Sequence, residues 1–283
     1  MFPGFDTPAS DKADARSLCV GGYRLGEMIG LGGTGAIYAA WPVESPGAVP
    51  VALKLLRADH ANEPDAIEGL RHEASLLGAL AHPSIVRALD AGTADTQPFL
   101  VLELLSGGSL QRLMRAGGPL PAWRVADLLD GVANALVWLH RRGIVHGDVK
   151  PMNLLRNGSG QVKLIDFGTA RAARDPDWHR PPHVATPAYA APERLLGLAP
   201  DPRDDVFSLA VVAYQLLAGR HPFGSDPVLA IGRPARPGGI DDEAWRRLLA
   251  ALAPARTDRP DDPSALIAAI GACHAASGAL CRD

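Results

Sequence analysis

Residues 146–153 read His-Gly-Asp-Val-Lys-Pro-Met-Asn, and a second short motif, Asp-Phe-Gly, begins at Asp166. Asp148, Asn153 and Asp166 place three oxygen-bearing side chains on segments that have the composition of loops. Hard divalent cations such as Mg²⁺ prefer oxygen ligands and share them with phosphate groups. Asp148 can accept the proton of an attacking hydroxyl, and Lys150 can neutralise charge on a transferred phosphoryl group. The two motifs predict a phosphoryl-transfer site, against the simpler interpretation that these residues only cap turns.

A glycine-rich segment, Gly-Leu-Gly-Gly-Thr-Gly, occupies residues 30–35. Its Gly-x-Gly-x-x-Gly pattern is a weak signal alone, because a dinucleotide-binding turn shares it but continues into a helix. Residues 36–41 have the composition of a strand, so we expect the glycines in a hairpin whose backbone N–H groups can face phosphates. The sequence has no Gly-x-x-x-x-Gly-Lys-Ser/Thr motif, which excludes a Walker-type phosphate loop.

Lys54 ends the apolar run Val-Ala-Leu-Lys and needs a partner if it is buried, since an unpaired ammonium group is costly to bury. Glu73 is the candidate partner. It falls in a predicted helix over residues 65–80, on the face that carries Leu70 and Leu77. The alternative is a lysine that reaches solvent from the end of a strand, and a glutamate on a solvated helix face.

The predicted elements change in character near residues 104–107. Before this point the apolar runs are short and strand-like, apart from the helix over 65–80, and after it helical periodicity dominates. This order predicts an α+β fold, with a small β-rich part followed by a larger helical part. The expected strands span residues 23–29, 36–41, 49–55, 86–90 and 99–103, and the later helices span residues 121–141, 205–218, 242–251 and 263–275.

The composition along the chain also suggests domain boundaries. The first residues are rich in Pro, Asp, Ser and Ala without periodicity, which is typical of a flexible leader. We therefore expect a leader at 1–20, one domain at 21–273 with parts at about 21–104 and 105–273, and a tail at 274–283.

The overall composition is that of an ordinary globular chain. The 283 residues carry 28 Lys and Arg against 31 Asp and Glu, which argues against nucleic-acid binding by bulk positive charge and against a polybasic membrane anchor. Three cysteines without a Cys-x-x-Cys pair give neither a disulfide framework nor a zinc signature. The first residues show neither the basic nor the apolar region of a secretory signal, so we expect none, and the longest apolar stretch, residues 206–219, is too short to span a bilayer. We expect a cytoplasmic protein.

Taken in this order, the motifs resemble those of the eukaryotic-type, or Hanks-type, protein kinases, and the short loops resemble the bacterial serine/threonine kinases of that superfamily. The resemblance extends from Tyr23 to Ile270 and implies a bilobal fold with a small β-rich lobe and a larger helical lobe. In that family Glu193 pairs with the late arginine, Arg259. The further matching motifs are His82-Pro83-x-Ile85-Val86, Leu102-Glu103-Leu104-Leu105, Ala191-Pro192-Glu193 and Asp205.

The resemblance also implies roles for individual residues. The catalytic residues would be Asp148, Lys150, Asn153 and Asp166, of which Asn153 and Asp166 would hold Mg²⁺, with Mn²⁺ as an alternative ion. ATP would be bound by Ile29, Gly30, Gly32, Gly33, Thr34, Gly35, Ile37, Ala52, Lys54, Glu73, Glu103, Leu105 and Leu155. Structural roles would fall to His146, Phe167, Gly168, Thr186, Glu193, Asp205 and Arg259. The implied partner is a protein phosphorylated on serine or threonine, with no nucleic acid and no membrane span, and the oligomeric state stays open.

One departure from the family concerns the catalytic loop. The family usually has an arginine between the loop histidine and aspartate, where this chain has Gly147. That arginine normally binds a phosphorylated residue of the activation segment. Between Asp166 and Glu193 this chain has no serine, and its two threonines, Thr169 and Thr186, fall at positions that look structural. We therefore expect activity that does not depend on phosphorylation of this segment.

Two other functions stay open. A His-Gly-Asp-x-x-x-x-Asn loop also resembles that of the phosphotransferases that act on antibiotics and other small molecules and share the fold. Lys150, the Asp-Phe-Gly motif, Thr186 and the pair of Glu193 with Arg259 favour a protein substrate instead. The other alternative is a binding-only pseudokinase, although the chain keeps the residues that such proteins tend to lose: Lys54, Glu73, Asp148, Asn153 and Asp166.

Overall fold

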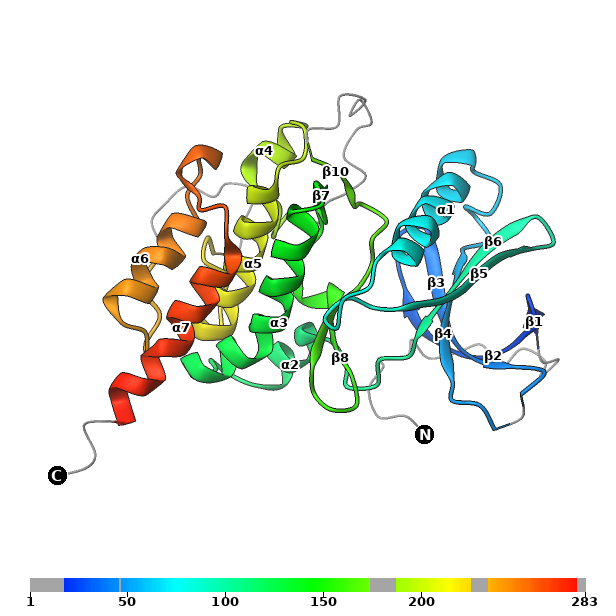
Figure 1. Cartoon of the computed structure of the whole chain (residues 1–283), viewed down its shortest axis with the longest axis horizontal. Helices are drawn as coiled ribbons and strands as arrows, with labels where there is room; N and C mark the ends of the chain where they lie inside the picture. Colours follow the sequence, from blue (N-terminus) through cyan, green and yellow to red (C-terminus); the bar gives the residue numbers. More distant parts are fainter. Residues whose placement is uncertain (1–17, 46, 174–186, 225–233, 279–283) are drawn as a thin grey trace. The chain divides into compact units, whose positions relative to one another are not determined.

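The structure is a computed structural model that describes residues 18–45, 47–173, 187–224 and 234–278. It divides into two compact units. The predicted α+β class is confirmed, because the first unit is built on a sheet and the second mainly on helices (Figure 1). Among the described residues, the first unit comprises those up to Gly108 together with Arg156–Gly160, and the second comprises Ser109–Leu155 and those from Gln161 onward.

A six-stranded antiparallel sheet forms the first unit, in the order β1-β2-β3-β4-β6-β5. Helix α1, Pro64–Ala79, packs against this sheet and contacts β4, β5 and β6 (Figure 1). The apolar core of the sheet includes Leu53, Phe99 and Val101, which are all buried. The strands are β1 Cys19–Val20, β2 Tyr23–Leu31, β3 Gly35–Pro42, β4 Val51–Leu56, β5 Ala88–Ala94 and β6 Gln97–Glu103.

The strand predicted over residues 86–90 is shifted along the chain. Strand β5 begins at Ala88 and continues to Ala94, whereas Ile85 and Val86 lie in the connection before it. Both of these side chains are buried. Their apolar character therefore reflects the packing of the connection and not a strand.

A tight two-residue turn at Asp95 and Thr96 joins β5 to β6. Ala94 pairs with Gln97 across this turn, so β6 begins two residues before the predicted strand at 99–103. Asp95 and Thr96 both have positive φ angles, 47° and 74°. Glycine or asparagine usually occupies such positions, and a β-branched threonine is strained there.

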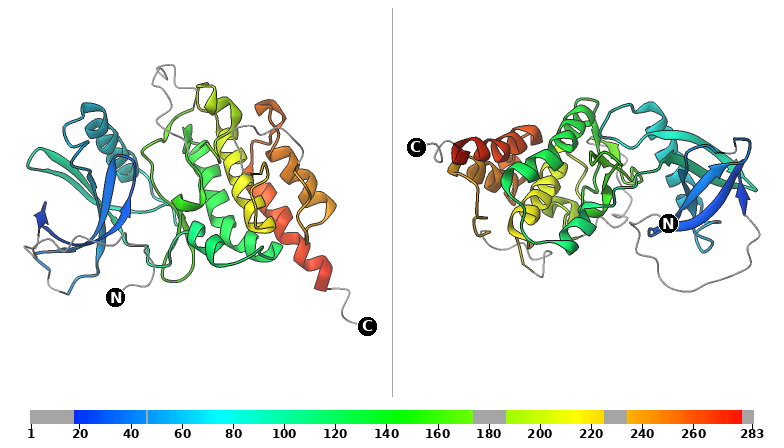
Figure 2. Two further views of the ribbon diagram at one scale, coloured as in Figure 1. Left: turned by 180° about the vertical axis from the view of Figure 1, so that it is seen from behind. Right: turned by 90° about the horizontal axis from the view of Figure 1, so that it is seen from below.

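Helices α3 and α5 form the centre of the second unit. Helix α3 contacts α5 and α7, and the two views of Figure 2 show α3 and α7 side by side. Helix α5 is buried without interruption from Asp204 to Tyr214, which explains its long apolar sequence. The helices are α2 Leu110–Ala116, α3 Ala122–His140, α4 Pro192–Leu195, α5 Pro202–Ala218, α6 Asp242–Ala251 and α7 Pro263–Gly278. The shorter elements are β7 Ile144–Val145, β8 Leu154–Arg156, β9 Val162–Leu164, β10 Arg171–Ala172 and the 3₁₀ turns η1 Pro151–Asn153 and η3 Arg256–Asp258.

Helix α5 begins three residues before its predicted start at Asp205. The Asp201 side chain accepts the N–H of Arg203 at 3.0 Å, and the Asp204 side chain accepts the N–H of Asp201 at 3.0 Å. Asp201 and Asp204 thus form a capping box, with Pro202 as the first helical residue. The apolar pattern misses this start because the first turn of the helix is charged.

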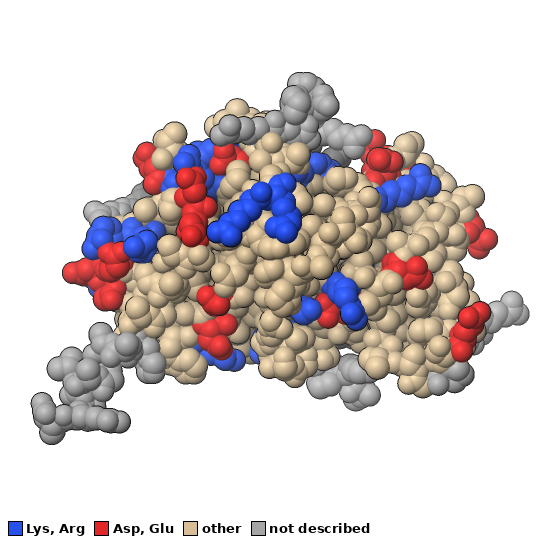
Figure 3. Space-filling view, in the orientation of Figure 1, with Lys and Arg blue, Asp and Glu red and all other residues tan. Residues whose placement is uncertain are grey.

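The surface carries charges of both signs. On the face shown in Figure 3, Lys and Arg side chains lie among Asp and Glu side chains, and uncharged residues cover most of the area between them. Ion pairs between surface side chains include Arg57 with Asp59 and Arg203 with Asp261. Among the residues that the structure describes, no helix combines the length and the apolar character needed to cross a membrane.

Candidate active site

Lys54 and Glu73 form a buried ion pair in the first unit. The Lys54 Nζ donates to the two carboxylate oxygens of Glu73 at 2.7 and 3.0 Å. Glu73, on α1, is 2% exposed, and the side chain of Lys54, on β4, is 16% exposed. The structure brings the two residues together as the sequence predicts. The alternative of a solvated lysine and a solvated glutamate is wrong.

The glycine-rich segment forms the turn between β2 and β3. Gly32 donates its N–H to the Gly35 carbonyl oxygen at 2.8 Å, and a strand follows instead of a helix. A Cβ atom added at Gly35 would lie 3.2 Å from the Leu55 carbonyl oxygen and 3.4 Å from the Lys54 side chain. One added at Gly33 would meet nothing within 4 Å. The absence of a side chain at Gly35 therefore leaves space for the Lys54 side chain, and the space beside Gly33 is open.

The structure places the other predicted ATP-binding residues in both units. Ile37 and Ala52 lie on the neighbouring strands β3 and β4, and Ala52 is buried. Glu103 ends β6, and its side chain accepts the N–H of Arg87 at 2.8 Å. The first unit also holds Ile29, Gly30, Thr34 and Leu105, and the second unit holds Leu155.

A buried aspartate of the second unit anchors the loop that leads to Asp148. Asp205 accepts the N–H of His146 through Oδ2 at 2.9 Å and the N–H of Gly147 through Oδ1 at 2.8 Å. His140, at the end of α3, contacts the same carboxylate at 2.8 Å. Burial raises the pKa of Asp205, but the hydrogen bonds with His140 and the loop outweigh burial and lower it below its usual value. Asp205 therefore holds the loop as a carboxylate.

Asp148 lies at the centre of a small polar cluster. The Lys150 Nζ is 2.6 Å from Asp148 Oδ2, and the Asn153 Nδ2 donates to the same oxygen at 2.9 Å. Asn153 Nδ2 also donates to the Asp148 backbone carbonyl oxygen at 2.9 Å. Asp148 is 8% exposed, and burial raises its pKa although the positive charge of Lys150 opposes the shift. This carboxylate binds a proton more readily than a solvated one.

Two contacts of Ile165 link the Asp-Phe-Gly motif to this cluster. Ile165 donates its N–H to the Asn153 carbonyl oxygen at 3.0 Å, and its own carbonyl oxygen lies 3.1 Å from His146 Nε2. Phe167 is fully buried, with its ring edge-on to the His146 ring at a centroid distance of 4.8 Å. Asp166 has a φ of 64°, a strained angle for a residue other than glycine. A strained backbone persists only where the surrounding structure holds it in place, and such residues cluster at functional sites.

The donor set of the cluster suits a divalent cation. Asn153 directs its amide nitrogen to Asp148, which leaves its side-chain oxygen as a ligand, and Asp166 supplies a carboxylate. Within the described residues, no three His, Cys, Asp or Glu side chains gather into a site that would enclose a metal. Two protein oxygens, with phosphate oxygens and water completing the shell, are the usual arrangement for Mg²⁺.

Gly147 has a backbone conformation that favours glycine. Its φ is 80°, and an added Cβ atom would lie 3.4 Å from the Thr169 carbonyl oxygen. Thr169 donates its hydroxyl hydrogen to the His146 carbonyl oxygen at 3.0 Å, and Arg171 donates to the Gly168 carbonyl oxygen at 3.1 Å. Glycine avoids the cost of a side chain at positive φ, about 1–2 kcal/mol. Thr169 holds the loop backbone, in agreement with the structural position predicted for it.

Glu193 and Arg259 pair as the resemblance implies. Arg259 donates to both carboxylate oxygens of Glu193, from Nη1 to Oε1 and from Nη2 to Oε2 at 2.8 Å, and its guanidinium lies 4.8 Å from the ring centroid of Phe207. Burial raises the pKa of Glu193, but hydrogen bonds from Arg259 outweigh burial and lower it to about 2. Thr186, which the sequence assigns a structural role, lies outside the described residues.

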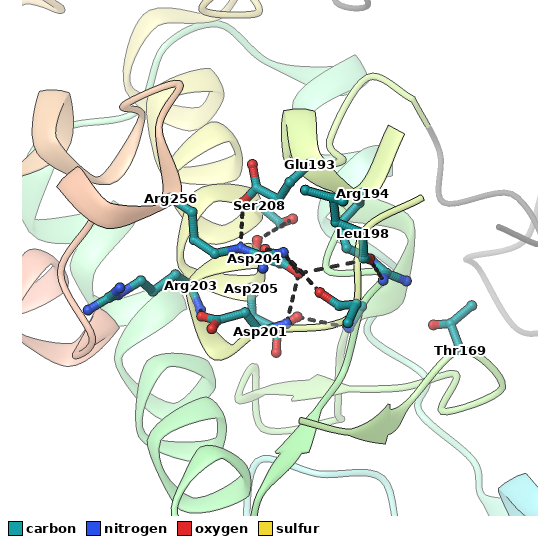
Figure 4. Close-up of polar contacts among 12 residues, drawn as sticks. Thr169, Glu193, Arg194, Leu198, Asp201, Arg203, Asp204, Asp205, Ser208 and Arg256 are labelled. Atoms are coloured by element: carbon teal, nitrogen blue, oxygen red, sulfur yellow. Dashed lines mark hydrogen bonds and ion pairs between the residues drawn. The ribbon is translucent and has the colours of Figure 1, made fainter. Parts of the chain in front are cut away.

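Sequence reasoning missed two members of this cluster, Asp204 and Arg256. Arg256 hydrogen-bonds to the carboxylates of both Asp204 and Glu193, as Figure 4 shows for the first of these. Burial raises the pKa of Asp204 to about 8, and its interaction with Glu193 adds to the increase. The capping pattern Asp-Pro-x-Asp was the signal available for Asp204. No sequence signal pointed to Arg256.

Comparison with known proteins identifies the family. A family profile described as "Protein kinase domain" matches residues 23–233. The similar proteins include serine/threonine-protein kinase PknB of Mycobacterium leprae, which is 37% identical over 213 residues that cover 73% of this chain and 34% of PknB. They also include serine/threonine-protein kinase Pkn1 of Myxococcus xanthus, 36% identical over 261 residues that cover 88% of this chain and 37% of Pkn1. Serine/threonine-protein kinase PknL of Mycobacterium bovis is 38% identical over 210 residues that cover 74% of this chain and 52% of PknL.

The chain therefore corresponds to one part of longer relatives. It spans 34% of PknB, 37% of Pkn1 and 52% of PknL. The profile match and these identities agree with the two motifs in the second unit and with the Lys54–Glu73 pair in the first. This chain belongs to the eukaryotic-type (Hanks-type) protein kinases, with bacterial serine/threonine-protein kinases as its relatives.

Proposed function

We propose that this chain transfers the γ-phosphate of Mg·ATP to serine or threonine hydroxyls of proteins. The observation that carries the proposal is the cluster of Asp148, Lys150 and Asn153, in which a buried carboxylate is held between an ammonium group and an amide. Phosphoryl transfer asks little covalent chemistry of the protein and depends on positioning and on neutralising charge. This cluster offers both.

Lys54 binds the phosphates of ATP in this mechanism. Glu73 holds the ammonium group at 2.7 Å and so fixes its direction. The lysine side chain keeps 16% of its surface exposed, so an anion can approach it without breaking the ion pair. Backbone N–H groups of the turn at residues 30–35 are further candidates for phosphate contacts.

Asp148 accepts the proton of the acceptor hydroxyl. Lys150 and Asn153 orient its carboxylate, and Lys150 also offsets negative charge on the phosphoryl group in transfer. Asn153 and Asp166 would hold Mg²⁺, which, when bound, neutralises the charge of the phosphate oxygens. Burial raises the pKa of Asp148, so this carboxylate becomes protonated more readily as the pH is lowered. On acidification the rate should therefore begin to fall at a higher pH than it would with a solvated carboxylate.

A protein acceptor is favoured over the small-molecule alternative. The relatives are named serine/threonine-protein kinases, and the pair of Glu193 with Arg259 belongs to the pattern of kinases that act on proteins. The intact contacts of Lys54 and Asp148 weigh against a pseudokinase. We propose that the reaction takes place in the cytoplasm, where ATP is available.

The function is tested by incubating the chain with radiolabelled ATP and Mg²⁺, alone, with casein, and with a panel of aminoglycosides and other small alcohols. We expect label on serine or threonine of casein by phosphoamino-acid analysis. Asp148→Asn should lower the rate by about 10²–10⁴ while ATP binding persists. Asp127→Asn, at an exposed position of α3, is the matched control and should leave the rate unchanged.

Two outcomes would contradict this function. Label confined to the small alcohols would support the small-molecule phosphotransferase. Full activity of Asp148→Asn would remove Asp148 from its role as proton acceptor.

We extend the proposal to regulation: the reaction does not need a phosphate on the activation segment. Gly147 offers no side chain to bind such a phosphate, and Thr169 uses its hydroxyl on the His146 backbone. Residues 174–186 lie outside the described residues. Treatment with a broad phosphatase, checked by intact mass, should leave the initial rate on casein unchanged, whereas a lag that ends as phosphate returns would contradict this.

A further inference from the structure

The first turn of α5 carries two consecutive buried aspartates with different partners in the second unit. Asp205 is 0% exposed and accepts the N–H groups of His146 and Gly147, which directly precede Asp148. Asp204 is 2% exposed and belongs to the Glu193 cluster (Figure 4). Asp204 and Asp205 are consecutive residues of one helical turn, so we expect a displacement at Asp204 to reach the loop that carries Asp148.

Arg256 joins three segments of the second unit. Its Nε donates to Glu193 Oε1 at 3.2 Å. Its Nη2 donates to Asp204 Oδ1 at 3.0 Å and to the Ala199 carbonyl oxygen at 3.0 Å. In Figure 4 the Arg256 side chain reaches from η3 to the carboxylate of Asp204. One guanidinium thus ties α4, the loop after it and the first turn of α5 together.

The two arginines near Glu193 make different sets of hydrogen bonds. Arg259 is enclosed and donates to the carbonyl oxygens of Ala253 and Pro254, at 2.7 and 2.8 Å, so it fixes Glu193 to the loop before η3. Its one bond to the first turn of α5, to the Arg203 carbonyl oxygen, is longer, at 3.4 Å. Arg256 is 24% exposed and reaches the first turn of α5 through its bonds to Asp204. Arg194, beside Glu193 on α4, approaches the same aspartate less closely, at 3.9 Å.

We propose that Arg256 is a positioning residue for phosphoryl transfer: by holding Glu193 and Asp204 together it fixes the first turn of α5 and, through Asp205, the loop that presents Asp148. The inference rests on the proposed kinase activity. A phosphate on an activation segment normally orders that segment through about one to three charge-assisted hydrogen bonds. Arg256 makes charge-assisted contacts of this kind from within the fold, which suits a chain whose loop has glycine at position 147.

Two substitutions at Arg256 separate its charge from its geometry. Arg256→Met removes the charge and the donors while keeping an unbranched side chain. Arg256→Lys keeps the charge but loses the planar set of donors. Arg203→Met is the matched control, because Arg203 directly precedes Asp204 and pairs with Asp261, whose side chain is 80% exposed.

Amide hydrogen exchange measures how firmly the backbone amides of the loop are held, and it does not depend on enzyme activity. In Arg256→Met we expect the amides of His146 and Gly147 to exchange about tenfold faster or more, the factor that one lost charge-assisted hydrogen bond represents. Arg256→Lys should lie between Arg256→Met and the wild type. Arg203→Met should stay within about twofold of the wild type. Wild-type exchange at both amides in Arg256→Met would overturn the proposal.

Steady-state kinetics separate positioning from loss of folded protein. We expect kcat on casein to fall about tenfold in Arg256→Met, while KM for ATP stays within about twofold because Lys54 and Glu73 lie in the other unit. Rates are expressed per site that binds ATP. If kcat per site is unchanged and only the number of such sites falls, Arg256 is merely structural and the proposal is overturned.

Different outcomes would overturn the positioning role of Arg256 and the proposed kinase function. If Arg256→Met does not fold, Arg256→Lys carries the test, and wild-type exchange together with wild-type kcat in that variant would overturn the proposal. If the wild-type chain phosphorylates neither casein nor the small alcohols, the proposed function fails. The exchange rates of His146 and Gly147 then still decide whether Arg256 positions the loop.

Discussion

Lys54 with Glu73 in the first unit, and Arg259 with Glu193 in the second, are both pairs of a cation and a buried glutamate, but they differ in exposure and in connections. The Lys54 side chain is 16% exposed, whereas the Arg259 side chain is 0% exposed. The first pair joins one strand to one helix. The second is part of a cluster with Asp204 and a second arginine.

The difference separates a pair suited to a ligand from a cluster suited to the fold. A cation that keeps part of its surface exposed can contact an anionic ligand in addition to its carboxylate. An enclosed guanidinium contacts the protein around it, so its removal leaves buried carboxylates without a counter-charge. We therefore expect the two ion pairs to have different roles, and four substitution experiments test that distinction.

Breaking the second cluster has the largest expected effect. Arg259→Met removes the main partner of the buried Glu193 carboxylate, and loss of one member of such a pair costs about 3–5 kcal/mol of folding free energy. Urea unfolding followed by circular dichroism measures this cost. The control is Arg236→Met, which removes an exposed pair with Asp242 and should cost at most about 1 kcal/mol. An equally small cost for Arg259→Met would mean that the cluster does not hold the fold.

Neutralising the first pair should remove turnover and preserve the fold. The double variant Lys54→Met/Glu73→Gln replaces the ion pair by neutral side chains, an exchange that often costs little stability, here about 1–2 kcal/mol or less. It also removes the ammonium group assigned to the phosphates of ATP, so kcat/KM should fall by about 10²–10³. Arg57→Met, at an exposed pair in the same unit, is the control and should keep wild-type turnover.

The single variants sharpen this result. If Lys54 and Glu73 act as one unit, each single substitution should lose most of the turnover that the double variant loses. Simple additivity would contradict the pairing in the working enzyme. Wild-type turnover in the double variant would remove Lys54 from the mechanism.

The first pair could be predicted from the sequence, and the second cluster only in part. A lysine on an apolar strand requires a partner, and the helix over 65–80 offered Glu73 on its apolar face, so local patterns were sufficient. The pairing of Glu193 with Arg259 came from the family resemblance, because no local pattern connects residues so far apart in the sequence.

Arg256 and the start of α5 show why the rest was missed. The apolar pattern placed the start of this helix at Asp205, since the turn before it is charged and only its capping geometry reveals it. Arg256 lies in a short 3₁₀ turn without periodicity. Its partners Glu193 and Asp204 become its neighbours only when distant segments pack together, which a sequence pattern does not encode.

The pH dependence of stability should report the opposite pKa shifts of Asp204 and Glu193 in the second cluster. The pKa of Asp204 in the folded chain, about 8, lies above its ordinary value of 3.8, so the folded state binds more protons than the unfolded state between these limits. The contribution of Asp204 to the free energy of unfolding therefore falls as pH rises from about 4 to about 8, by up to ~1.4 kcal/mol per pH unit. The opposite shift of Glu193, to about 2, acts as pH falls below about 4.5.

Asp204→Asn removes this titration, so its unfolding free energy should change less with pH than that of the wild type. Urea unfolding of both chains at pH 5, 6, 7 and 8 measures the two slopes. Asp201→Asn, at the half-buried N-cap position of the same capping box, keeps Asp204 and should retain the wild-type slope. Parallel slopes for Asp204→Asn and the wild type would show that Asp204 is ionised throughout this range.

The smallest expected effect concerns the turn between β5 and β6. A substitution there should change the stability of the first unit without changing turnover. Thr96 is exposed and has a φ of 74°, which a β-branched residue adopts only at a cost. Thr96→Gly should raise the free energy of unfolding by about 0.5–1 kcal/mol, because relief of this strain exceeds the extra backbone entropy that glycine loses. Thr93→Gly makes the same change within strand β5, where the backbone is extended, and should instead lower stability by about 0.5–1 kcal/mol. Turnover should match the wild type in Thr96→Gly, since this turn carries no residue assigned to ATP.

Two outcomes would contradict this prediction. Loss of stability in Thr96→Gly would show that the turn is not strained. A changed kcat would mean that the contribution of the first unit to turnover depends on more than the Lys54–Glu73 pair.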